Sequence, residues 1–167
     1  MRNMSFRGKC VDDNDWVNGY YTELPVGSLG ATIFANTDEV ITEDTDSFII
    51  AITTRQYSSL SPANPLEVVE SELIKVIPET IGQFTGLLDK NGNKIFEDDI
   101  IKTKFYGKDT GNGVNFNDYD YFRVVYHEAS FCIENATRRF VITSESAKRF
   151  EIIGNIYDNP ELLKENN

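Results

Sequence analysis

Short runs of β-type residues, separated by turn residues along almost the whole chain, most constrain what this sequence can fold into. The runs are rich in Val, Ile, Thr, Phe and Tyr, and Gly, Asn, Asp and Pro stand between them, as is typical of strands and the turns that join them. No long segment keeps apolar residues at helical spacing between helix caps. The sequence therefore predicts a mainly β fold with little helix.

Most of the predicted elements are strands of five to eleven residues. Strands are predicted at Ser5–Val11, Asp15–Leu24, Ala31–Ala35, Ser47–Tyr57, Phe84–Leu88, Ile95–Phe96, Asp99–Tyr106, Tyr121–His127, Phe131–Glu134, Arg138–Thr143 and Phe150–Tyr157. The segment Leu66–Ile77 fits either a short helix or a strand. A single helical turn is predicted at Asn159–Leu163, because Asn caps helices well and Pro160 suits the first helical position.

Three Asn-Gly pairs, beginning at Asn18, Asn91 and Asn112, favour tight turns. Asn and Gly both tolerate the positive φ that such turns require. The pair at Asn91 lies between two predicted strands and predicts a hairpin there. The strands that follow position 77 are short and closely spaced, which is typical of a small barrel.

The charge distribution supports a boundary near position 77. The net charge of −11 divides into −7 for residues 1–76 and −4 for residues 77–167. We therefore expect an N-terminal β-rich region over residues 1–76, a C-terminal barrel over 77–163 and a tail over 164–167. A chain of 167 residues is long enough for one domain or two small ones.

The composition excludes several functions. Proteins that bind nucleic-acid backbones or anionic membranes need an excess of Lys and Arg, whereas here 16 basic residues face 27 acidic ones. The longest apolar run, Phe48–Ile52, is far too short to span a bilayer, and no apolar stretch of signal-peptide length begins the sequence. The sequence therefore indicates a cytoplasmic protein, in which Cys10 and Cys132 are free thiols.

Four carboxylates are weak candidates for a metal site. Asp118 and Asp120 end a polar loop that is rich in oxygen ligands, and Glu97 and Asp99 flank a second acidic cluster. Adjacent residues of a strand point to opposite faces, which opposes convergence on one ion at the second cluster. The segment from Asp89 begins like a calcium loop, but it lacks the glycine and the glutamate that complete one.

Catalytic and cofactor motifs are not found. His127 is the one histidine of the sequence, and a pairing with Cys132 across a turn lacks an orienting third group. The sequence has no phosphate loop that ends in Lys-Ser/Thr and no Cys-x-x-Cys pair. We therefore expect no catalytic residue and no cofactor, and a protein that is not an enzyme.

The one basic concentration of the sequence is a candidate partner-binding surface. Arg138 and Arg139 stand next to Phe140, and Lys148 and Arg149 follow nearby. Cations beside aromatic rings are typical of proteins that bind single-stranded nucleic acid, although the acidity of the chain disfavours nucleic acid as the partner.

Two sequence blocks carry a family resemblance. Gly-Gln-Phe-Thr-Gly-Leu stands at residues 82–87, and Ile-Gly-Asn-Ile-Tyr-Asp-Asn-Pro at residues 153–160. Together with the segments 6–9 and 15–20, they make the chain resemble the YopX family of phage and prophage proteins over nearly its whole length. The resemblance implies a Src-homology-3-like barrel in the C-terminal part and a bacterial host cell, but no activity. Asp98 stands where the family usually has glycine, and Asp also tolerates the left-handed conformation.

The leading hypothesis is a non-enzymatic phage or prophage accessory protein. It would bind a protein partner, or itself in a homo-oligomer, because many strands present edges that need cover. The alternatives are an acidic DNA mimic that occupies a host DNA-binding protein, a metal-dependent hydrolase and a single-stranded nucleic-acid binder.

Overall fold

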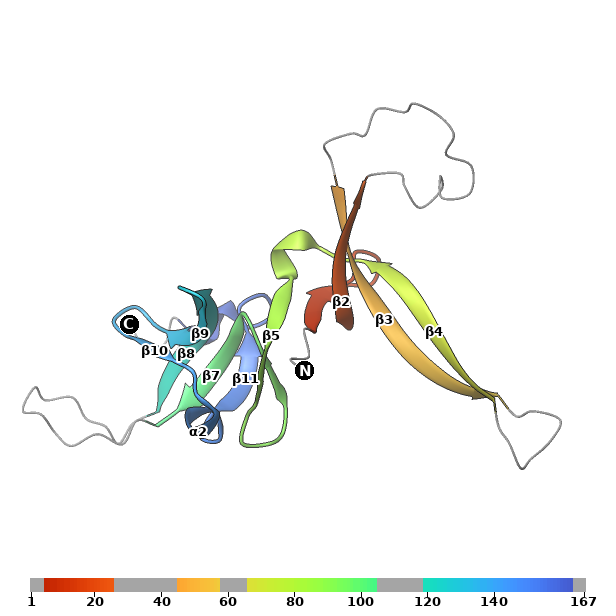
Figure 1. Cartoon of the computed structure of the whole chain (residues 1–167). Helices are drawn as coiled ribbons and strands as arrows, with labels where there is room; N and C mark the ends of the chain where they lie inside the picture. Colours follow the sequence, from red (N-terminus) through yellow and green to blue (C-terminus); the bar gives the residue numbers. More distant parts are fainter. Residues whose placement is uncertain (1–4, 26–44, 58–65, 105–118, 164–167) are drawn as a thin grey trace, which may run out of the picture. The chain divides into compact units, whose positions relative to one another are not determined.

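The structure is a computed structural model that describes residues 5–25, 45–57, 66–104 and 119–163. It is mainly β, with two antiparallel sheets and little helix, as the sequence predicts. Its contacts divide it into two compact units, an N-terminal unit over Ser5–Ile81 and a C-terminal unit that begins at Gly82 (Figure 1). None of the described helices is long and apolar enough to cross a membrane. The strand predicted at Ala31–Ala35, Asp118 and the third Asn-Gly pair lie outside the described residues.

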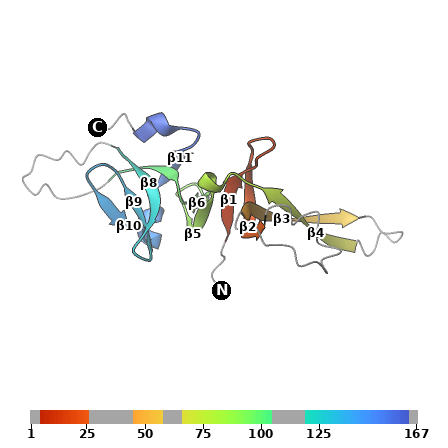
Figure 2. The same cartoon turned by 90° about the horizontal axis from the view of Figure 1, so that it is seen from above.

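The N-terminal unit holds four antiparallel strands in the order β4-β3-β2-β1 (Figures 1 and 2). Their bounds are β1 Phe6–Lys9, β2 Trp16–Pro25, β3 Thr45–Tyr57 and β4 Leu66–Lys75. The ambiguous segment from Leu66 is thus a strand. It pairs with β3 over ten consecutive positions, a long-range interaction that overrides a weak local helix preference.

Asn18-Gly19 is not a turn, because it lies inside β2. A Cβ added at Gly19 would overlap the carbonyl oxygen of Ile50 on β3. The glycine is therefore needed for the close approach of two strands rather than for a positive φ. Next to this contact, Phe48 and Ile49 are almost fully buried and form part of the core of the unit.

The C-terminal unit begins with a hairpin of β5 (Gly82–Leu88) and β6 (Lys94–Phe96). The second Asn-Gly pair lies in its turn, where Gly92 has φ +85°, so the predicted hairpin is confirmed. A short 3-10 helix, η1 (Pro78–Thr80), precedes the hairpin, and another, η2 (Pro160–Leu163), provides the helical turn predicted near the end of the chain.

Five further strands form an antiparallel sheet in the order β10-β9-β8-β7-β11 (Figure 1). They are β7 Asp99–Thr103, β8 Asp120–His127, β9 Ser130–Glu134, β10 Arg139–Val141 and β11 Glu151–Asn155. Ile101, Phe122, Val124 and Ile133 share one face and are at most 1% exposed. The short helix α2 (Ser144–Ala147) was not predicted; it packs Ala147 into this core.

The expected closure into a Src-homology-3-like barrel is not found among the described residues, where the five strands form an open sheet. In the described part of the chain, the strand pairings end at β10 on one side and at β11 on the other, without closure. Because an exposed strand edge can pair with another chain, what covers each of these two edges bears directly on function.

Candidate functional site

The edge strand β10 presents all three of its residues to solvent. Phe140 and Val141 are 37% and 59% exposed, and Arg139 is also exposed. The strand ends where Thr143 caps α2: its hydroxyl accepts a hydrogen bond from Ser146 N, and its own N–H donates to Ser146 Oγ. This capping box turns the chain away from the sheet directly after Ile142, so β10 stays short.

The hydrogen-bond alternation of β10 leaves two residues facing outward. Asn135 N donates to the Arg138 carbonyl, and Ile142 N donates to the Phe131 carbonyl. Since the bonded pairs of an antiparallel ladder occur at every second residue, Phe140 directs its backbone groups toward β9. The N–H and C=O groups of Arg139 and Val141 therefore point away from β9, where no other described strand pairs with them.

The opposite edge, β11, is covered by the turn of the β5–β6 hairpin. Asp89 Oδ2 accepts a hydrogen bond from Ile152 N at 3.2 Å. Lys90 N donates to the Phe150 carbonyl at 3.0 Å, and Lys90 Nζ pairs with Glu151 at 2.9 Å. One edge of the sheet is thus blocked by a turn from the same unit, and the other is open.

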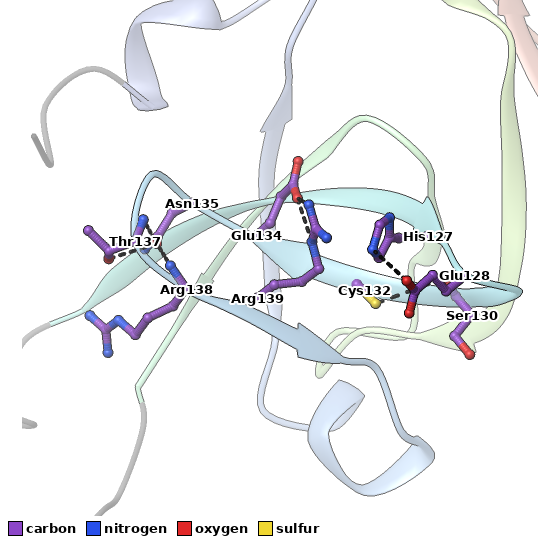
Figure 3. Close-up of polar contacts among 9 residues, drawn as sticks. All are labelled: His127, Glu128, Ser130, Cys132, Glu134, Asn135, Thr137, Arg138 and Arg139. Atoms are coloured by element: carbon purple, nitrogen blue, oxygen red, sulfur yellow. Dashed lines mark hydrogen bonds and ion pairs between the residues drawn. The ribbon is translucent and has the colours of Figure 1, made fainter.

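The two arginines beside the open edge are neutralised. Arg138 pairs with Asp120 at 3.1 Å. Arg139 pairs with Glu134 across the β9–β10 ladder at 2.6 Å, as Figure 3 shows. Phe140 lies edge-on to the buried ring of Phe122, with 6.1 Å between the ring centroids. The predicted Arg138, Arg139 and Phe140 surface therefore exists at one edge, but it presents ion pairs rather than free positive charge.

An open pocket of about 460 Å³ adjoins the start of β10. Its walls come from the beginning of β8, the β9–β10 turn and the last described residue of η2; its lining residues are Asp120, Tyr121, Arg123, Glu134, Asn135, Ala136, Thr137, Arg138 and Leu163. The turn is fixed by the side-chain oxygen of Asn135, which accepts hydrogen bonds from the backbone of Thr137 and Arg138 (Figure 3).

The candidate metal ligands engage other groups. Asp120 is held by Arg138, Glu97 accepts a hydrogen bond from Gln83 N at 3.0 Å, and Asp99 accepts one from Phe96 N at 2.8 Å. Among the residues that the structure describes, no group of three or more His, Cys, Asp or Glu side chains is arranged to hold a metal ion.

The acidic turn between β6 and β7 holds strands together. Asp98 has φ +66°, the left-handed conformation expected where the family pattern has glycine. Its carboxylate accepts hydrogen bonds from Arg123 Nε of β8 at 2.8 Å and from the Tyr157 hydroxyl at 2.7 Å. Burial raises the pKa of Glu97, a hydrogen bond from Gln83 N lowers it and the charge of Asp98 raises it, and the net effect is a raised pKa.

His127 and Cys132 contact different neighbours. His127 stands opposite Ser130 in the ladder, and its Nε2 lies 3.8 Å from exposed Glu128, whereas Cys132 is buried and its thiol contacts the Ser130 carbonyl (Figure 3). Cys10 is also buried and free.

The sequence indicated Arg138, Arg139 and Phe140, but it did not predict that their strand is an open edge, and it missed exposed Val141 and the role of Asp89 at the other edge. All three depend on strand order, which local patterns do not encode.

Comparison with known families decides the identity. The model of the family described as YopX protein matches residues 5–164. The chain belongs to the YopX family. This YopX chain is also similar in fold to a solved structure, protein EF1440 from Enterococcus faecalis, with a TM-score of 0.53 and 23% sequence identity, over 98% of this chain and 99% of that one. None of the curated proteins compared with it matches.

Proposed function

We propose that this YopX chain is a non-enzymatic protein-interaction module that accepts an extended segment of a partner protein as an added strand on β10. The observation that carries the proposal is the outward-facing N–H and C=O groups of Arg139 and Val141. Strand addition uses such groups for affinity and neighbouring side chains for specificity. The resemblance to the YopX family of phage and prophage proteins supports a role for this interaction in phage or prophage biology, inside the bacterial host cell.

The contrast between the two edges supports this assignment. An exposed edge is a liability that proteins usually cover, and the turn at Asp89 covers β11. At β10 the short length and the Arg139–Glu134 pair discourage indiscriminate aggregation. They leave exposed Val141 and Phe140 as apolar contacts for a specific segment.

The occupant that charge favours is another protein rather than a second copy. Each copy carries −11, so self-association brings together two strongly acidic molecules. The ion-paired arginines also disfavour single-stranded nucleic acid at this edge, because Arg138 and Arg139 have carboxylate partners.

Peptides selected on the natural chain from a displayed library of random twelve-residue sequences test the proposal. Their affinities are then compared for two variants of Val141. Val141→Pro removes an outward N–H without touching the bonds to β9, whereas Val141→Ala shortens the side chain and keeps the N–H. We expect selected peptides to bind Val141→Pro at least tenfold more weakly and Val141→Ala within about threefold, with light scattering to detect self-association. Strand addition would be contradicted if the selected peptides bind Val141→Pro and the natural chain with equal affinity. It would also be contradicted if no peptide can be selected.

A further inference from the structure

A second candidate site lies in the C-terminal unit, around the exposed ring of Tyr119. The ammonium groups of Lys102 and Lys104 each lie 4.4 Å from the centroid of that ring. The pairing of Thr103 with Asp120 explains the arrangement, since it brings the end of β7 alongside the residue that precedes β8. Lys102 and Lys104 are two residues apart and therefore share one face of the sheet.

These two lysines differ from most cations of the unit. In an acidic chain, carboxylates outnumber cations, and the described residues of this unit contain five ion pairs between Lys or Arg and a carboxylate: Lys90–Glu151, Arg123–Asp98, Arg138–Asp120, Arg139–Glu134 and Lys148–Glu145. No described carboxylate forms such a pair with Lys102 or Lys104. Among the described residues, Lys102 and Lys104 therefore place positive charge without an ion-pair partner beside an exposed aromatic ring, which favours an anionic ligand.

The two ammonium groups are close enough for their flexible side chains to meet at one anion. Both nitrogens lie 4.4 Å from one ring centroid, so they are no more than about 9 Å apart. The attraction of each cation to the exposed tyrosine ring opposes the mutual repulsion of the two ammonium groups. An anion that bridges them would remove that repulsion and gain two charge-assisted hydrogen bonds.

We propose that Lys102, Lys104 and Tyr119 bind a small phosphate monoester with an aromatic body, of the mononucleotide class. Lysine ammonium groups suit phosphate as compact point charges, and a monoester carries the charge that two lysines balance. Tyr119 is 47% exposed, which leaves ring surface for contact with a base. The net charge of −11 opposes a long polyanion, whose other phosphates would meet an acidic surface.

Titration of ¹⁵N-labelled protein at low salt tests this site, with adenosine 5′-monophosphate, adenosine, inorganic phosphate and an eight-residue oligothymidylate as separate probes. We expect the monophosphate to shift the backbone signals of Lys102, Lys104 and Tyr119 and to bind several-fold more tightly than phosphate or adenosine. No shift with the monophosphate, equal affinity for inorganic phosphate, or tighter binding of the oligonucleotide would overturn the proposal.

Two double variants separate the site from general electrostatics. Lys102→Gln with Lys104→Gln is expected to weaken binding of the monophosphate at least tenfold. Lys94→Gln with Lys148→Gln removes the same charge elsewhere in the unit, including a lysine that also lies near a ring, that of Phe84, and is expected to change affinity less than twofold. Equal losses in the two double variants, each with a well-dispersed spectrum, would show nonspecific attraction and overturn the site.

Discussion

The Tyr157 hydroxyl donates a 2.7 Å hydrogen bond to Asp98, 59 residues earlier in the chain. The same carboxylate binds Arg123 of β8, while the Asp98 backbone accepts a hydrogen bond from Ile156 N and donates one to Val124. One residue at positive φ therefore joins the start of β7, the middle of β8 and the chain after β11. This junction fixes the sheet whose far edge is β10.

Substitution of Asp98 should separate its conformational role from its side-chain role. Asp98→Gly keeps the left-handed turn and loses both side-chain partners, so we expect its free energy of unfolding to fall by about 1–3 kcal/mol. Asp98→Ala also loses the partners and tolerates the positive φ less well, so its loss should be about 1 kcal/mol larger. Urea unfolding followed by far-UV circular dichroism measures both.

Tyr157→Phe provides the matched control for that junction. It removes one hydrogen bond and keeps the ring, so a loss of about 1 kcal/mol is expected. A glycine variant at least as stable as the natural chain would contradict the junction role of Asp98.

Glu97 should make the C-terminal unit less stable as the pH rises. Its pKa in the folded protein is raised above 4.5, with burial as the leading cause. The folded state therefore holds the proton more tightly than the unfolded state, and stability falls as the pH rises from about 4.5 through the raised pKa. Glu97→Gln should flatten this dependence and be relatively more stable at pH 7 than at pH 4. Urea unfolding at several pH values measures the free energy of unfolding of both proteins. The same pH dependence in the natural chain and in Glu97→Gln would contradict this role of Glu97.

Asp89 should make the C-terminal unit more stable as the pH rises, the opposite of the effect of Glu97. Burial raises the pKa of its carboxyl, but hydrogen bonds from the backbone of Asn93, Ile152 and Asn91 outweigh this and lower it below 3.8. The contribution of Asp89 to the free energy of unfolding is therefore present above about pH 4 and is lost as the pH falls through the lowered pKa.

Asp89→Asn tests this turn and the covering of β11 together. The amide offers fewer acceptor positions to three N–H groups, so we expect a loss of about 2 kcal/mol at pH 7 that shrinks toward pH 3. Faster amide exchange at Ile152 should accompany it, because Ile152 N loses its acceptor. A stability loss without change at Ile152 would mean that the turn does not protect this edge.

Gly19→Ala should destabilise the N-terminal unit by about 3 kcal/mol or more, because the added methyl group overlaps the backbone of Ile50. Trp16 is the single tryptophan of the chain and lies in this unit, so its fluorescence reports the transition. Gly86→Ala is the comparison and is followed by far-UV circular dichroism, because it lies in the C-terminal unit. Its added Cβ meets no neighbour within 4 Å, but φ is +84°, so its unfolding free energy should fall by about 1–2 kcal/mol. If Gly19→Ala has the same free energy of unfolding as the natural chain, the close approach of β2 and β3 at this position is contradicted.

The strands and hairpin turns were predictable where alternation and turn chemistry are local, as at Asp89–Lys94. Leu66–Lys75 was not, because its strand state depends on pairing with β3. The helix at Ser144–Ala147 escaped prediction because Ser146 completes its capping box in place of the usual Glu or Gln.

For the candidate site, the sequence indicated Arg138, Arg139 and Phe140, but it did not show that Asp120 and Glu134 neutralise the arginines. Ion pairs between separate strands follow from strand order. The alternation of Lys102 and Lys104 along the predicted strand Asp99–Tyr106 was visible in the sequence, whereas their convergence on Tyr119 required the pairing of β7 with β8.

Amide hydrogen exchange along β10, with and without a selected peptide, tests the central claim most directly. In the free protein we predict slow exchange at Phe140, which faces β9, and fast exchange at Arg139 and Val141, which face outward. Peptide binding should slow exchange at Arg139 and Val141 at least tenfold and leave Phe140 protected. Peptide binding that leaves the Arg139 and Val141 amides unchanged would contradict strand addition at this edge.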